Sequence, residues 1–197
     1  MKKKIILVGG GGHCASCIDV IEQEGNYEIA GIVDSDSSIE SLLGYPFLGM
    51  DADLDRLRAL YDCALVTIGQ ISGPAVRSRV FLHLRALNYE MPAIVSPRAY
   101  VSKHATVGEG TIVLHDALVN ARASIGQNCI INTKALIEHD SNIGDNCHVS
   151  TGAIVNGGVT LGSGSFLGSN AGTKQLAVVN ENEFVRAGTF FVGHDNA

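Results

Sequence analysis

The sequence predicts two structural units in series, an α/β unit built on a parallel sheet over residues 1–92 and a parallel β-helix over residues 93–197. Two observations predict this fold class. Apolar runs alternate with helical stretches in the first half, and aliphatic residues recur at every sixth position in the second. The composition agrees, because 46% of the residues are hydrophobic and 23 are glycine, yet no stretch approaches the roughly 20 apolar residues that a membrane span needs.

The first half has the pattern of a small, doubly wound, Rossmann-like sheet. The strand expected at residues 4–8 is continuously apolar from residue 5 onward, which is typical of a strand that is buried on both faces, and residues 29–33 and 63–68 are similar. Helical stretches cover about residues 14–24 and 74–88, the second beginning with a proline, which suits a first helical turn. This alternation predicts parallel strands with helices packed on both faces.

A glycine-rich turn follows the first predicted strand. Residues 9–12 are all glycine, His13 comes next, and Asp34 ends the second strand about 20 residues later. Glycines let a ligand approach the backbone, a helix N-terminus favours an anion, and a carboxylate accepts hydroxyl hydrogens. The pattern suits a nucleotide ligand, although a tight strand-to-helix turn explains it equally well. We do not expect NAD, because the unit has room for only about half of a two-part Rossmann fold.

The five cysteines predict reduced thiols rather than a disulfide framework, because their number is odd and their positions are scattered. Cys14 and Cys17 form a Cys-x-x-Cys pair that could be a redox pair or half of a zinc site. No second cysteine pair exists, so we expect two ordinary thiols in a helix.

The second half has a period of six, which fits neither a helix nor an alternating strand and indicates the hexapeptide repeat of a parallel β-helix. Small residues stand four positions after most of the aliphatic ones, where they would fill corners of the coil. Gly108, Gly126, Gly144 and Gly162 lie 18 residues apart, so we expect one corner of a three-sided coil to take glycine for its turn conformation. The aliphatic positions are Val95, Val101, Val107, Val113, Val119, Ile125, Ile131, Ile137, Ile143, Val149, Val155, Leu161 and Leu167.

Polar residues interrupt this repeat at two places. One is Glu138-His139-Asp140, and the other is His148 with Ser150. A histidine beside a carboxylate can serve as a general base whose imidazolium the carboxylate stabilises. An outward-facing charged patch on a coil face would contain the same residue types, so the residues alone leave both interpretations open.

Taken together, these motifs resemble the bacterial nucleotide-sugar acetyltransferases of surface-glycan synthesis, a family of left-handed β-helix hexapeptide-repeat acyltransferases. The resemblance covers nearly the whole chain and is carried by the glycine loop with His13, the strand ending in Asp34, and residues 132–140 followed by His148-Val149-Ser150. The family includes N-acetyltransferases of UDP- or other nucleotide-linked 4-amino-4,6-dideoxy sugars and sialic acid O-acetyltransferases. It implies acetyl-CoA as co-substrate and a homotrimer with active sites between subunits.

The resemblance also implies roles for single residues. His139 takes the position of the catalytic base, and Asp140 that of the carboxylate that raises its basicity. Gln70 stands where the family more often has asparagine. The implied acetyl-CoA contacts are His148, Gly157, Ser169 and Ala187, and the implied nucleotide-sugar contacts are Gly11, Gly12, His13, Asp34, Ser35 and Gly69.

From these roles we expect direct acetyl transfer. His139 removes a proton from the sugar amine while the nitrogen attacks the acetyl-CoA carbonyl, and no serine or cysteine nucleophile stands beside it in sequence for a covalent route. The expected acceptor is a nucleotide-linked 4-amino-4,6-dideoxy sugar, and the alternative is O-acetylation of sialic acid or a related nonulosonic acid.

Other function classes find less support. A β-helix zinc enzyme could use His115, His139 and His148, but separations of 24 and 9 residues do not stack them on successive coils, so we expect no metal. A non-catalytic β-helix would bind no acetyl-CoA. A net charge of −6 without a basic tract beyond three lysines argues against nucleic acid, and the short apolar run after those lysines is no signal peptide, so we expect a cytoplasmic protein.

Overall fold

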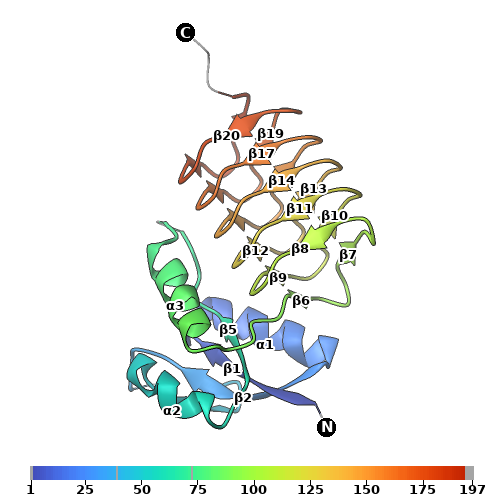
Figure 1. Cartoon of the computed structure of the whole chain (residues 1–197). Coiled ribbons are helices and arrows are strands. Elements are labelled where there is room, and N and C mark those ends of the chain that lie inside the picture. Colours follow the sequence, from blue (N-terminus) through green and yellow to red (C-terminus); the bar gives the residue numbers. More distant parts are fainter. Residues whose placement is uncertain (1, 39, 72, 194–197) are drawn as a thin grey trace.

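The computed structural model describes residues 2–38, 40–71 and 73–193 (Figure 1). The N-terminal unit contains a five-stranded sheet with the order β3-β4-β2-β1-β5. Strand β1 pairs in parallel with β2 and β5, β4 runs parallel to β2, and β3 is antiparallel to β4. Its elements are β1 (Lys3–Val8), α1 (Gly12–Glu24), β2 (Tyr27–Val33), β3 (Ser41–Leu42), β4 (Tyr45–Gly49), the 3-10 helix η1 (Asp51–Asp53), α2 (Leu54–Arg58), β5 (Cys63–Val66) and α3 (Ala75–Ala86).

The predicted doubly wound arrangement is present, because alternate residues of β1 enter two different cores. Ile5 and Leu7 pack with the buried face of α1, whereas Ile6 and Val8 pack with residues of α2 and α3. The hairpin of β3 and β4 was not predicted, and it makes the sheet mixed rather than wholly parallel. Its residues are half exposed and include Pro46, so they lack the apolar run that marks a buried strand.

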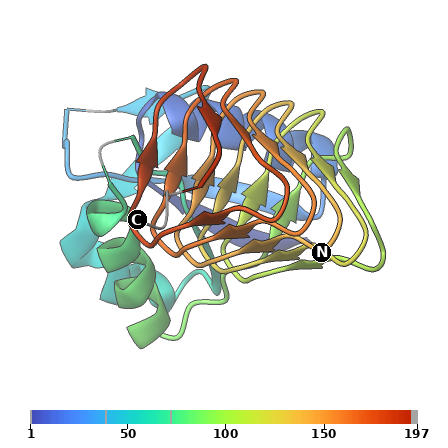
Figure 2. The same cartoon turned by 90° about the horizontal axis from the view of Figure 1, so that it is seen from above.

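The second unit is the predicted left-handed β-helix, in which three parallel sheets form the three faces of the coil (Figure 2). Every ladder pairs a residue with the one 18 positions later, as Val119 with Ile137. The strands are β6 (Ile94–Val95), β7 (Tyr100–Val101), β8 (Thr106–Val107), β9 (Ile112–Val113), β10 (Leu118–Val119), β11 (Ser124–Ile125), β12 (Ile130–Ile131), β13 (Leu136–Ile137), β14 (Asn142–Ile143), β15 (His148–Val149), β16 (Ile154–Val155), β17 (Thr160–Leu161), β18 (Phe166–Leu167), β19 (Gly172–Thr173), β20 (Val178–Val179), β21 (Phe184–Val185) and β22 (Phe190–Phe191).

The aliphatic residues at every sixth position form the interior of the coil, as predicted. The stack extends beyond Leu167, where the sequence pattern ended: Thr173 and Val179 are fully buried, Val185 is nearly so, and Phe191 packs against the same core. The inward stack therefore continues for four more hexapeptides than the aliphatic pattern indicated, because the single threonine at position 173 breaks the run of aliphatic residues without interrupting the coil.

Backbone conformation and close packing explain which residues occupy the corners of the coil. Every sixth residue from Gly110 to Gly188 has a positive φ, and most of these residues are glycine, asparagine or aspartate. The glycines 18 residues apart have another cause than the predicted turn conformation. A Cβ on Gly108 would lie 2.5 Å from the carbonyl oxygen of Gly126, so these glycines allow one coil's backbone to approach the next.

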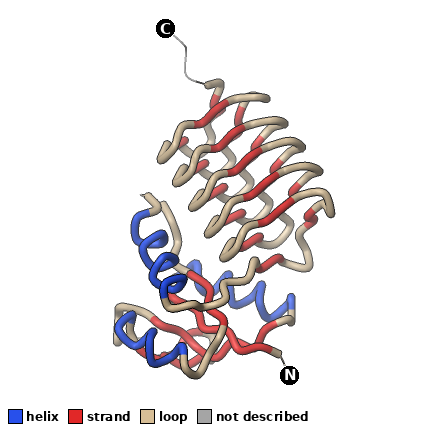
Figure 3. The backbone as a smooth tube through the Cα atoms, in the orientation of Figure 1, coloured by secondary structure: helices blue, strands red, loops and turns tan. Residues whose placement is uncertain are grey.

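The two units share a continuous core. Ile112 and Ile130 of the β-helix pack in one cluster with Ile18 of α1. From α3, the buried guanidinium of Arg77 donates hydrogen bonds to the carbonyl oxygens of Val66 and Ile68 and to that of Asn128 on the coil. All described helices lie in the N-terminal unit (Figure 3), and none of them is long and apolar enough to cross a membrane.

Candidate active site

A cavity of about 500 Å³ opens at the carboxyl ends of β1, β2 and β5. Ligands commonly bind at this edge of an open α/β sheet. All six residues that the family resemblance implied for nucleotide-sugar binding line this cavity, although they come from three separate segments of the chain: Gly11, Gly12, His13, Asp34, Ser35 and Gly69.

The sequence left open whether the glycine run serves a tight turn or a ligand, and the structure is consistent with both at different glycines. Gly9 has a φ of +114°, and a Cβ there would clash with Ile68, so this glycine serves the tight turn. A Cβ on Gly11 or Gly12 would meet nothing within 4 Å, so the space above these two residues is open. Gly11 is also the N-cap of α1 and makes no side-chain cap; the Cys14 N–H donates to its carbonyl oxygen at 2.9 Å, which leaves the N–H groups of Gly12 and His13 available to an anion.

Asp34 ties the end of β2 to this loop. Its Oδ2 accepts a hydrogen bond from the Gly10 N–H at 2.5 Å, and its Oδ1 accepts one from the Asp36 N–H at 2.8 Å. The Ser35 hydroxyl lies 3.5 Å from the same Oδ1. The carboxylate therefore fixes the shape of the cavity edge and also lines the cavity itself.

The structure adds residues that the sequence did not indicate, notably Arg79 and Asp51. Arg79 is exposed on α3 and brings a cation to the cavity wall. An arginine on a helix is most often part of a solvated face. The sequence therefore offered no reason to place Arg79 at the cavity, whose wall α3 borders. His13 is neutral, because burial lowers its pKa to about 3, and its Nε2 lies 3.5 Å from the Cys17 Sγ.

All five cysteines are free and buried. Burial raises the pKa of Cys14 to about 11 and raises that of Cys17 further, so neither is a thiolate at neutral pH. Both side chains belong to the core between α1 and the sheet.

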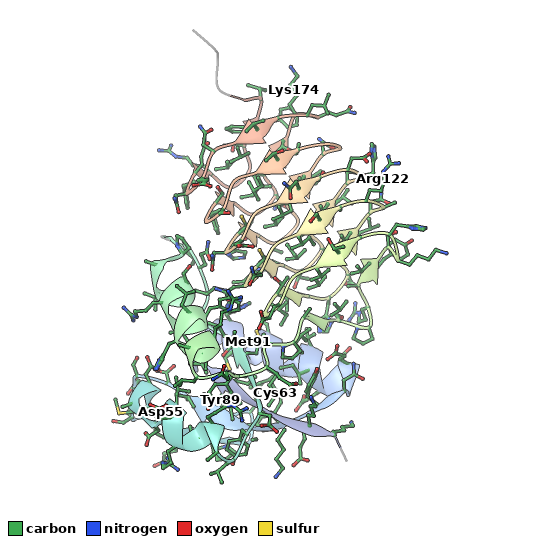
Figure 4. All side chains as sticks on the ribbon, viewed as in Figure 1. Asp55, Cys63, Tyr89, Met91, Arg122 and Lys174 are labelled. Carbon is green, nitrogen blue, oxygen red and sulfur yellow. The ribbon has the colours of Figure 1, made fainter. Side chains whose placement is uncertain are left out.

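The second group of predicted residues lies on the β-helix. His139 stands in the corner between β13 and β14, and its Nδ1 lies 2.7 Å from Oδ2 of Asp140. If Nδ1–H is the donor, Nε2 keeps its lone pair and can accept a proton. Arg122 donates two hydrogen bonds to the Asp140 carboxylate and, with His139, holds the pKa of that group well below its usual range. Figure 4 labels Arg122, whose side chain lies at the outer edge of the coil.

Gly157 lies one coil beyond His139 and faces its imidazole. A Cβ at this position would stand 3.0 Å from both Cε1 and Nε2 of the ring. The absence of a side chain here leaves room at the nitrogen that would act as the base.

His148, on β15, is buried rather than exposed to a ligand. Its Nδ1 lies 2.6 Å from the carbonyl oxygen of Gln70, and the Asn132 amide nitrogen lies 3.0 Å from its Nε2. Burial lowers its pKa to about 4, so the ring is neutral. Gln70 itself donates to the Asn146 carbonyl oxygen at 2.9 Å, so this residue joins the loop after β5 to the coil.

The predicted acetyl-CoA contacts do not share one place on the coil: His148 lies on strand β15, and the other three lie in two different corners, one of which also holds the predicted base. His139 and Gly157 lie in the corner between the sheet of β13 and that of β14, whereas Ser169 and Ala187 lie in the corner that follows β18 and β21. The Ser169 hydroxyl is 3.0 Å from that of Ser150. Within one chain these residues therefore belong to different corners of the coil.

The three histidines of the zinc hypothesis have unrelated partners. The Nε2 of His115 lies 2.7 Å from Oδ2 of Asp19 and its Nδ1 lies 2.6 Å from the Ser96 hydroxyl, whereas His139 and His148 have the contacts given above. Within residues 2–38, 40–71 and 73–193, no group of three or more metal-ligating side chains comes together.

Comparison with known families and structures agrees with this architecture. The model of the PglD N-terminal domain family matches residues 4–84. A search of curated proteins by sequence gives no match. The acetyltransferase domain of PglB from Neisseria gonorrhoeae, solved with acetyl coenzyme A, is similar with a TM-score of 0.89 and 27% identity, over 98% of this chain and 92% of that one.

PerB from Caulobacter crescentus, a perosamine N-acetyltransferase solved with CoA and GDP-perosamine, has a TM-score of 0.90 and 30% identity, over 96% of this chain and 89% of that one. The chain belongs to the nucleotide-sugar acetyltransferases of the hexapeptide-repeat family. The family and the enzyme class inferred from the sequence, an acetyltransferase with acetyl-CoA as co-substrate, are thereby confirmed. WeeI from Acinetobacter baumannii has the same fold as this nucleotide-sugar acetyltransferase. Its TM-score is 0.73 and its identity 22%, over 100% of this chain and 99% of that one.

Proposed function

We propose that this chain transfers the acetyl group of acetyl-CoA to the amino group of a nucleotide-linked 4-amino-4,6-dideoxy sugar in bacterial surface-glycan or glycoprotein-glycan synthesis. One combination of features carries the proposal. The chain has an open, glycine-lined cavity of about 500 Å³, and its coil carries the His139–Asp140 pair, with room at Nε2 of the imidazole. A relative of 30% identity has been solved with both CoA and a nucleotide-linked sugar, GDP-perosamine.

In this mechanism the nucleotide lies in the cavity, with its phosphates near the N-terminus of α1. His139 accepts a proton from the sugar amine at Nε2 while the nitrogen attacks the thioester carbonyl. Asp140 stabilises the imidazolium through Nδ1–H, and the backbone N–H of Gly157 stabilises the oxyanion. The tetrahedral intermediate then collapses, the C–S bond breaks, and CoA leaves as a thiolate.

The active form would be a homotrimer. Ser169 and Ala187 lie in a different corner from His139, which supports an acetyl-CoA molecule held between two neighbouring subunits, one contributing each corner. The cytoplasmic location stays a prediction.

The test is a thiol-release assay with acetyl-CoA and a panel of acceptors: UDP-, dTDP- and GDP-linked 4-amino-4,6-dideoxy sugars, and free sialic acid. We expect release only with a nucleotide-linked amino sugar. Release with sialic acid alone would contradict the proposal and indicate an O-acetyltransferase.

His139→Ala should lower turnover with the preferred acceptor by roughly 10²–10⁴, the usual contribution of a general base. His83→Ala, which changes an exposed histidine on α3, is the matched control and should keep wild-type turnover. Turnover of His139→Ala within about tenfold of the parent would show that His139 is not the base.

A further inference from the structure

Glu138 and Asp140, the two acidic residues on either side of His139, both accept hydrogen bonds from the preceding coil. On the coil that precedes it, Arg122 donates from Nε to Oδ1 of Asp140 at 2.6 Å and from Nη2 to Oδ2 at 2.9 Å. On the same preceding coil, the Asn120 amide donates to Oε2 of Glu138 at 2.9 Å, and this oxygen lies 3.3 Å from the His139 backbone nitrogen. The two acids beside His139 are therefore held in place from the coil 18 residues earlier.

Asp140 depends on this support because of its position. Its backbone is left-handed, with a φ of 62°, and its side chain is 38% exposed. The imidazole of His139 is 53% exposed, and the distances above give it one side-chain hydrogen bond, to Asp140. Without a second partner, the carboxylate would exchange its contact with Nδ1 for water, and the ring could turn its basic nitrogen away.

We propose that Arg122 is a positioning residue for acetyl transfer: it holds Oδ2 of Asp140 where this atom accepts the Nδ1–H of His139. The proposal rests on the proposed function of His139 as the base. Arg122 touches neither substrate in this scheme. It acts through Asp140, and its planar guanidinium, which can form two parallel hydrogen bonds, fixes the plane of the carboxylate.

The coil contains a second, nearly identical arginine–aspartate pair that supplies a control. Arg98 lies 18 residues before Asp116, as Arg122 does before Asp140, and it donates from Nη2 to Oδ2 of Asp116 at 2.9 Å. Asp116 also has a left-handed backbone and also follows a histidine, His115. That histidine contacts Asp19 and Ser96 instead of Asp116, so this pair stacks coils without orienting an imidazole.

A charge effect of Arg122 would have the opposite sign. The guanidinium partly neutralises Asp140, so removing its charge alone would let the carboxylate stabilise the imidazolium better and would raise turnover. Loss of position lowers turnover, because a displaced base aligns poorly with the amine. The direction of the change in kcat therefore decides between the two roles.

The first test needs no acceptor. In the full chain labelled with ¹⁵N-histidine, NMR reports which ring nitrogen of His139 carries the proton, with His139→Asn used for assignment. We expect the Nδ1–H tautomer in the parent and in Arg98→Gln, and a mixture of tautomers in Arg122→Gln. An unchanged tautomer in Arg122→Gln would overturn the proposal.

The second test measures turnover with the acceptor preferred in the thiol-release panel. Arg122→Gln should lower kcat about tenfold with KM for acetyl-CoA unchanged, and Arg122→Lys, which keeps the charge and one donor, should recover part of the loss. Arg98→Gln should keep parental kcat. An equal loss in Arg98→Gln, or a kcat of Arg122→Gln at or above that of the parent, would overturn the proposal.

A variant with His139→Asn separates this proposal from that of the base. In that background Arg122→Gln should cause no further loss, because the arginine acts through the ring that is missing. A further tenfold loss there would contradict the proposal while leaving the base assignment intact. Retention of activity by His139→Asn itself would contradict the base assignment.

Discussion

At the scale of single residues, His148 shows how a buried imidazole links the two halves of the chain. It is 6% exposed and lies between the carbonyl oxygen of Gln70 and the amide of Asn132. Protonation would place a charge in this junction and remove the acceptor at Nε2. Burial accordingly lowers the pKa of the ring to about 4.

This lowered pKa predicts a loss of stability in mild acid. Above about pH 6.5 the ring is neutral in both states; below it the unfolded chain binds a proton that the folded chain does not bind until about pH 4. Between pH 7 and 5 the free energy of unfolding should fall by about 2 kcal/mol more in the parent than in His148→Gln. Urea unfolding at fixed chain concentration measures this, with His83→Gln as the control. An equal pH dependence of His148→Gln and parent would contradict the expectation.

The sequence predicted the cavity residues because their types carry local information. Glycines and a carboxylate at the ends of parallel strands meet at one edge of a sheet, so Gly11, Gly12 and Asp34 could be placed together. Arg79 could not be placed, because its position depends on how α3 packs. The hydrogen-bond contact between His148 and Gln70 likewise depends on how the two units pack together, and the sequence periodicity contains no information about that packing.

At the scale of the elements, the coil was predictable because its repeat places one inward-facing aliphatic residue in every six. The hairpin of β3 and β4 gives no such signal, since its short strands are partly exposed. The corner glycines were predicted for the wrong reason. They were expected to relieve turn strain, yet the structure shows a close approach of adjacent coil backbones.

Close approach makes Gly126 sensitive to a single methyl group. A Cβ there would lie 2.7 Å from the carbonyl carbon of Gly144, which belongs to the rigid stack. Gly126→Ala should therefore lower the free energy of unfolding by about 1–3 kcal/mol. In Gly172→Ala the nearest atom is the ring of Phe190 at 3.2 Å, which can move, so this control should lose less than half as much. Thermal unfolding of both variants tests the expectation, and equal losses would contradict it.

At the scale of the whole molecule, the proposed homotrimer predicts that subunits complement each other, because Ala187 lies in another corner of the coil than His139. His139→Ala removes the proposed base, and Ala187→Trp should block acetyl-CoA at the other corner. Each variant alone should be inactive. Co-expressed as mixed trimers, they should regain about a quarter of parental activity, because random assembly pairs an intact His139 with a neighbour's intact Ala187 in about one site of four. Thiol release from the purified mixture measures this, and a mixture without activity would show that each site lies within one chain.

The uniform register of the coil also bears on how the chain folds. Every described ladder of the β-helix joins residues 18 positions apart, so this all-β half has the short-range contacts typical of repeat proteins rather than the distant pairings of a β-sandwich. Adding a coil closes only a short loop, which has a small entropic cost. The first coils pack on α1 and offer an unpaired strand edge to each new strand in order of synthesis. The coil can therefore grow from its docked end during translation, with one exposed strand edge per face at any time.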